Sequence, residues 1–145
     1  NVRRFAVGPK NPDRLYVPIQ GKGLYIITDV ASRGGVAKLK DFTNTIPNPN
    51  PAGLTGLLKD QFDEHNIVVV AVDPNHEEVV YALDNKFQEG MGNGVFRSTD
   101  FGETWTNLTQ GIGTHFSPIS ILVNPTDSYV YVFGAHGTWK LPPPG

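Results

Sequence analysis

A threefold internal repeat constrains the fold of this chain more than any other feature of its sequence. The three copies are FAVGPKNPDRLYV (Phe5 to Val17), VAVDPNHEEVVYA (Val70 to Ala82) and ILVNPTDSYVYVF (Ile121 to Phe133). Each copy is an alternating apolar stretch, a polar turn that contains proline, and a second stretch that carries a tyrosine. Two stretches with a period of two residues, joined by such a turn, predict a β-hairpin.

A third stretch led by glycine follows each hairpin: GLYIITD (Gly23 to Asp29), GVFRSTD (Gly94 to Asp100) and GTWKLP (Gly137 to Pro142). After the second of these, FGET predicts a turn into a fourth strand, TWTNL. Four antiparallel strands are the unit of a β-propeller blade. The sequence therefore predicts an all-β fold, a partial β-propeller of about two and a half four-stranded antiparallel blades.

The predicted domain organisation is a single propeller portion over residues 1–145, with blade-like units at about 1–43, 67–110 and 116–145 and an insertion at 44–66. The insertion opens with NTIPNPNPAG, which should be irregular. Leu54, Leu57, Leu58 and Phe62 then have helical spacing, so a short helix is expected there, although Gly56 weakens it. Propellers close with about 4–8 blades. We therefore expect the remaining blades to come from the same protein or from further copies of the chain.

Composition narrows the possible partners. The 16 Gly and 12 Pro are scattered between apolar runs, as expected for many short strands. The net charge of −2, without a charged block, argues against nucleic acid as partner. The longest apolar run, Ile67 to Val72, is too short for a membrane span.

With no Cys and four His that lack metal-ligand spacing, we predict no metal and no cofactor. The N-terminal Asn-Val-Arg-Arg lacks an initiator Met, so we expect a processed or excised piece.

One short motif carries a family resemblance. The stretch STDFGETW (Ser98 to Trp105) resembles the Asp-box, S-x-D-x-G-x-T-W, a repeat shared by sialidases, xyloglucan-degrading endoglucanases, sortilin-type receptors and photosystem-assembly propellers. It matches all five fixed positions: Ser98, Asp100, Gly102, Thr104 and Trp105. The resemblance spans Ile67 to Leu108, and reaches the other units through the internal repeat. The first unit departs from the pattern, because VASRGGVAKL follows Thr28-Asp29.

The same motif can also be interpreted as a turn. An aspartate can accept hydrogen bonds from N–H groups of its own loop, as in Asx-turns, and Gly102 can take a positive φ. Trp105 and Phe96 offer apolar area for packing between blades. We therefore predict a structural role for Asp100, with catalysis or metal binding as the alternative.

The resemblance implies that ligands meet the end of the propeller opposite this turn. The residues expected there carry acid, amide, aromatic and imidazole groups, a mixture that suits sugar recognition. The ligand-binding candidates are Asp84, Asn85, Phe87, Glu89, Asn93, His115 and His136. The alternative interpretation of the loop from Asp84 to Asn93 is a solvated connection without function.

No catalytic pair can be assigned from the sequence. Glycosidases place two carboxylates about 5–9.5 Å apart. The acids expected at the ligand end belong to no motif that matches an Asp-box glycosidase: they are Asp60, Asp63, Glu64, Asp84 and Glu89. Sialidases also need an arginine cluster, and the five Arg of this chain do not place three at that end, so a sialidase is disfavoured.

The predicted function is therefore part of a secreted carbohydrate-active Asp-box propeller. It would bind or hydrolyse a polysaccharide in the manner of a xyloglucanase-like glycoside hydrolase. The alternative is a non-enzymatic propeller module, either a lectin-like oligomer or a protein-binding scaffold of the sortilin or assembly-factor type.

Overall fold

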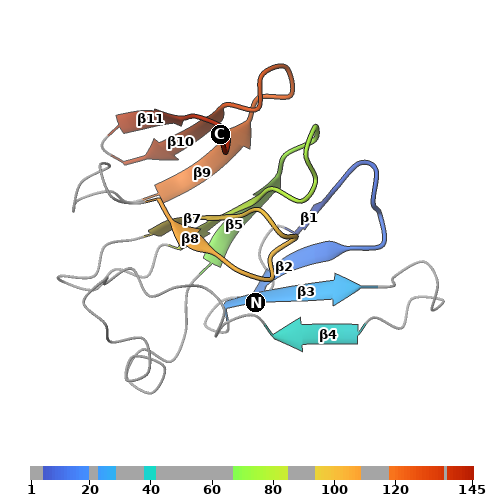
Figure 1. Cartoon of the computed structure of the whole chain (residues 1–145). Helices are drawn as coiled ribbons and strands as arrows, with labels where there is room; N and C mark the ends of the chain where they lie inside the picture. The colour runs from blue at the N-terminus through green and yellow to red at the C-terminus, as the bar shows by residue number, and fades with distance from the viewer. Residues whose placement is uncertain are drawn as a thin grey trace.

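The computed structural model describes residues 5–19, 23–28, 38–41, 67–84, 94–108, 118–135 and 137–145 (Figure 1). Within these residues the chain is all-β, as predicted. Its strands are β1 (Ala6–Val7), β2 (Leu15–Ile19), β3 (Gly23–Thr28), β4 (Lys38–Asp41), β5 (Ile67–Val72), β6 (Val80–Asp84), β7 (Gly94–Ser98), β8 (Thr106–Asn107), β9 (Pro118–Val123), β10 (Val130–Gly134) and β11 (Gly137–Leu141). Across the described ranges, no helix has the length and hydropathy needed to cross a membrane.

The strands form three antiparallel sheets. We call β1-β2-β3-β4 the first sheet, β5-β6-β7-β8 the second and β9-β10-β11 the third. Each sheet opens with a hairpin made by one copy of the repeat: β1 with β2, β5 with β6, and β9 with β10. The glycine-led strand then adds beside the hairpin in every sheet. The predicted hairpin and third strand are thus confirmed in all three copies.

Two apolar layers hold the sheets together, and the second sheet lies between the other two (Figure 1). Successive side chains of a strand point to opposite faces of the sheet. The second sheet therefore contributes to both layers: Val80, Ala82 and Phe96 pack toward the first sheet, while Tyr81, Leu83 and Val95 pack toward the third. The first layer is completed by Tyr16, Leu24 and Ile26, and the second by Ile121, Val123, Val130 and Val132.

The two ends of the sheets differ. At one end, Val80 pairs with both Val72 and Ser98, so the β5–β6 and β7–β8 turns lie together. We call this the turn end; it comprises the turns at 8–14, 73–79, 98–105 and 124–129. At the other end, Asp84 pairs with Ile67 and Gly94. We call this the loop end, because the connections from β2 to β3, from β6 to β7 and from β10 to β11 leave from it.

Some details depart from the sequence prediction or lie outside what the structure describes. The fourth strand expected over TWTNL is restricted to Thr106–Asn107. Trp105 precedes it because its side chain is buried in the first apolar layer and its indole N–H donates to the Gly102 carbonyl at 3.0 Å. The expected helix around Leu54 to Phe62, and the whole insertion at 44–66, lie outside the described residues.

Candidate functional site

The Ser98–Trp105 turn is a self-contained network of hydrogen bonds. The Ser98 hydroxyl donates to Asp100 Oδ1 at 2.7 Å and accepts the N–H of Gly102 at 2.7 Å. Asp100 Oδ1 also accepts the Thr104 N–H at 2.8 Å, and Asp100 Oδ2 accepts the Thr104 hydroxyl. The structure thus brings the five motif residues into one turn, and both carboxylate oxygens of Asp100 have partners within it.

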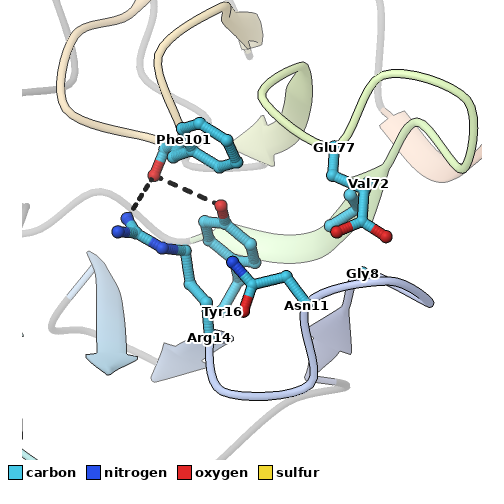
Figure 2. Close-up of a pocket in the computed structure, with 7 residues that line it drawn as sticks. All are labelled: Gly8, Asn11, Arg14, Tyr16, Val72, Glu77 and Phe101. Carbon is cyan, nitrogen blue, oxygen red and sulfur yellow. Dashed lines mark hydrogen bonds between the residues drawn. The ribbon is translucent and has the colours of Figure 1, made fainter. Parts of the chain in front are cut away.

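The backbone of this turn requires an unusual conformation at two consecutive residues. Gly102 has a φ of +87°, as expected for the glycine of such a turn, and Phe101 has a φ of +59°. Positive φ at a non-glycine residue is uncommon, and nothing in the sequence pattern predicted it at Phe101. The conformation directs the Phe101 carbonyl oxygen toward the first sheet (Figure 2).

The hydrogen bonds also set the acidity of Asp100. Partial burial raises the pKa of its carboxyl group, but hydrogen bonds from the Ser98 and Thr104 hydroxyls and from the Thr104 and Glu103 N–H groups lower it by more. The pKa of Asp100 therefore lies below its usual range. A general acid needs a pKa raised toward the working pH, which is the opposite direction.

The first and second sheets are joined across the turn end at Phe101. Its carbonyl oxygen accepts hydrogen bonds from the Arg14 guanidinium at 3.1 Å and from the Tyr16 hydroxyl at 3.2 Å (Figure 2). Burial raises the pKa of Tyr16 to about 12, against a smaller opposing effect of Arg14. The Glu77 carboxylate accepts the Lys10 N–H beside Gly8, which adds a second link between the sheets.

The hollow between these groups is too small for a sugar. It is lined by Gly8, Asn11, Arg14, Tyr16, Val72, Glu77 and Phe101 (Figure 2). Its space accommodates about one water molecule. We therefore assign these polar groups to holding the sheets together and not to binding a ligand.

The second and third sheets are joined in the same way at Asp73. This fully buried carboxylate accepts the Asn75 N–H at 2.8 Å and the Ser128 hydroxyl at 3.1 Å, and Asn75 Nδ2 donates to the Pro125 carbonyl at 2.8 Å. His76 is exposed beside it, with Nδ1 3.5 Å from Asp73 Oδ2. Asp73 and Ser128 were not among the candidates predicted from the sequence. The signal for Asp73 was a polar residue directly before proline, which recurs as Asn124 in the third repeat. No comparable pattern pointed to Ser128.

The loop end is where the ligand-binding candidates were expected, and Asp84 lies there. It is the last residue of β6, pairs with Ile67 and Gly94, and is 5% exposed. The other predicted candidates lie outside the described residues: Asn85, Phe87, Glu89, Asn93, His115 and His136. Among the residues that are described, no three His, Asp or Glu side chains are grouped as metal ligands would be.

Comparison with known proteins finds one protein with a similar sequence over part of this chain, and several solved structures with a similar fold. No family model matches the chain. A xyloglucanase from a Paenibacillus species is 28% identical over 109 residues, which are 74% of this chain and 10% of that protein. The chain therefore spans about a tenth of the length of this relative.

Three solved structures share the fold. YCF48 bound to D1 peptide has a TM-score of 0.59 at 14% identity, and the match covers 94% of this chain and 35% of YCF48. The GH74 enzyme of Niastella koreensis has a TM-score of 0.57 at 19% identity, covering 96% and 21%. An ancestral GH74 enzyme has a TM-score of 0.55 at 13% identity, covering 92% and 13%. All three are β-propellers, so the three stacked sheets have the architecture of part of a propeller.

Proposed function

We propose that this chain is part of a secreted carbohydrate-active propeller that binds or hydrolyses a polysaccharide in the manner of a xyloglucanase. The observation that carries the proposal is the 28% identity to the Paenibacillus xyloglucanase over 109 residues, in a chain whose fold resembles GH74 enzymes. In this proposal each sheet is one blade, the third lacks its fourth strand, and the Ser98–Trp105 turn is an Asp-box with a structural role.

The proposed ligand site is the loop end. At the turn end, two acceptors that could meet a sugar are already engaged: both oxygens of Asp100 have partners within their own turn, and the Phe101 carbonyl accepts two hydrogen bonds from the first sheet. Asp84 is the proposed anchor at the loop end, and the sequence that follows it supplies Asn85, Phe87, Glu89 and Asn93. Carboxylates and amides bind sugar hydroxyls, and aromatic rings stack on sugar faces.

The test is binding of xyloglucan oligosaccharides by calorimetry, with an assay for new reducing ends in parallel. Asp84→Asn should weaken binding about ten- to a hundredfold, because a hydrogen bond to a charged group contributes about 1.5–3 kcal/mol. Asp84 is buried, so thermal unfolding of the variant must show that it is folded. Asp127→Asn, which makes the same change in the exposed β9–β10 turn at the turn end, should leave binding unchanged. Equal affinities of Asp84→Asn and the unmodified chain would contradict the proposed site.

The rival function is a non-enzymatic module, lectin-like or protein-binding. One comparison favours it: the YCF48 structure, which contains a bound peptide, shares this fold over 94% of the chain. Binding to a peptide or protein, together with no binding to any glycan, would favour this alternative.

A further inference from the structure

The three hairpin turns differ in how they satisfy one backbone N–H group. In the second turn, the side chain of Asp73, the residue before the repeat proline, accepts the N–H of Asn75 at 2.8 Å. In the third turn, Asn124 stands at the same place and accepts the N–H of Thr126 at 2.9 Å. Both are Asx-turns, in which a side-chain oxygen caps the N–H two positions later. The first turn has Gly8 at this place, so it lacks a capping side chain there.

The second sheet supplies the missing oxygen. The Glu77 carboxylate accepts the Lys10 N–H, the group that corresponds to the capped N–H of the other two turns. A Cβ atom at Gly8 would lie 2.6 Å from both Cδ and Oε2 of Glu77, whose carboxylate therefore fills the place of a side chain at residue 8 (Figure 2). Gly8 does not have a positive φ, so the backbone itself does not require a glycine there. The glycine instead makes room for Glu77.

The second and third sheets meet through the same two positions of the repeat. Glu77 and Ser128 are each the third residue after the repeat proline. Ser128 contacts the capping residue of the second turn and donates its hydroxyl to Asp73 Oδ1 at 3.1 Å. We call the contact of Glu77 with the first turn the first joint, and the contact of Ser128 with the second turn the second joint. The later sheet thus provides an acceptor where the cap is missing and a donor where the cap is present.

We propose that Glu77 is the cap of the β1–β2 turn, which is therefore complete only when the second sheet is stacked on the first. Gly8 and Glu77 are a matched pair, as Asp73 and Ser128 are in the second joint. A change of one partner alone leaves the first joint with two carboxylates or with none. Two carboxylates repel each other, and an N–H group without its acceptor loses a charge-assisted hydrogen bond. The inference concerns two sheets within the chain and does not rest on a sugar ligand.

The experiment transfers the residues of the second joint to the first. Glu77→Ser removes the cap, so hydrogen exchange of the Lys10 amide, followed by NMR, should become several-fold faster, and the thermal unfolding midpoint should fall by about 5 °C. Adding Gly8→Asp supplies a cap from the turn itself, opposite a serine, as in the second joint. The double variant should recover both the slow exchange and the midpoint. If Glu77→Ser alone does not fold, a folded double variant with slow Lys10 exchange supports the proposal.

Two control variants separate the cap from other effects. Gly8→Ala fills the same space without an acceptor, so in the Glu77→Ser background it should leave the exchange of Lys10 fast. Glu78→Ser makes the same change at the neighbouring glutamate and should leave that exchange slow.

The sign of the effect of Gly8→Asp gives the decisive comparison. With Glu77 present it should lower the thermal midpoint, because two carboxylates then compete for one N–H group. In the Glu77→Ser background it should raise the midpoint. An effect of the same sign in both backgrounds, recovery of slow exchange by Gly8→Ala, unchanged exchange in Glu77→Ser, or a double variant that does not fold would overturn the proposal. Because none of these measurements involves xyloglucan, they fail independently of the proposed function.

Discussion

At the scale of the residue, both carboxylate oxygens of Asp100 are hydrogen-bonded within the turn that contains it. It accepts hydrogen bonds from the hydroxyls of Ser98 and Thr104 and from the Thr104 N–H, and its pKa is lowered as a result. That Asp100 accepts hydrogen bonds within its own turn could be predicted from the sequence, because all of its partners lie within four positions of it.

Replacement of Asp100 by Asn should therefore destabilise the fold in a pH-dependent way. A lowered folded-state pKa gives stability that is present above the unfolded-state pKa of about 3.9 and is lost as pH falls through the folded-state value. We expect Asp100→Asn to lower the free energy of unfolding by about 1–2 kcal/mol at pH 7. The difference should shrink below pH 4 in urea titrations. Glu103→Gln, a charge change at an exposed residue of the same turn, should not reproduce this pattern; equal effects would contradict the hydrogen-bond explanation.

At the scale of the element, the Ser98–Trp105 turn packs on the first sheet through Gly102. A Cβ atom at this glycine would lie 2.5 Å from Ile26 Cδ1 and 3.3 Å from Tyr16 Cε1, at a φ of +87°. Glycine is thus required both by the backbone conformation and by the close approach of the neighbouring sheet. The sequence predicted the first requirement and not the second, because Ile26 lies on a different sheet.

These two requirements can be separated by a double-mutant cycle. Gly102→Ala should lower the free energy of unfolding by about 1–3 kcal/mol, from overpacking together with the strained φ. In an Ile26→Val background, which removes the Cδ1 methyl, the same substitution should cost less, and the difference measures the steric part. Gly145→Ala meets no neighbour within 4 Å and should be neutral. A cost that is unchanged in the Ile26→Val background would assign the whole effect to φ.

At the scale of the whole molecule, hydrogen bonds between turns fix how the sheets stack. The Phe101 carbonyl receives Arg14 and Tyr16 from the first sheet, and Asp73 receives Ser128 from the third. These contacts join residues 50 or more positions apart in the chain. They lie at the turn end, which is why the ligand site is proposed at the loop end.

The contribution of Tyr16 to this stacking should be visible at high pH. Tyr16→Phe should cost about 1 kcal/mol near pH 7, since Arg14 still satisfies the Phe101 carbonyl. A folded-state pKa raised to about 12 gives stability that is present below the unfolded-state value of about 10 and lost as pH rises toward 12. The loss of stability above pH 10 should therefore be shallower in Tyr16→Phe, with Tyr81 retaining part of it. An unchanged slope in denaturant titrations would contradict this role.

The sequence alone was sufficient for the local structure: three hairpins, a glycine-led strand after each, and a turn in which Asp100 accepts hydrogen bonds and Gly102 has a positive φ. Side chains alternate between the two faces of a strand, and turn residues form hydrogen bonds with backbone groups only a few positions away. The spacing of residue types in the sequence is therefore enough to predict these elements. The alternation of connections also placed Asp84 at the end opposite the Ser98–Trp105 turn.

The tertiary structure decided what depends on partners far apart in the chain. It made Tyr16 a buried donor to Phe101, gave Phe101 a positive φ, and buried Asp84 to 5% exposure. It also determined that equivalent positions of the repeat have different environments: Leu83, two residues after Tyr81, is buried between sheets, while Phe133, two residues after Tyr131, is exposed. The physical reason is that burial depends on which sheet covers a given face, and the pattern within a strand specifies two faces without specifying their neighbours.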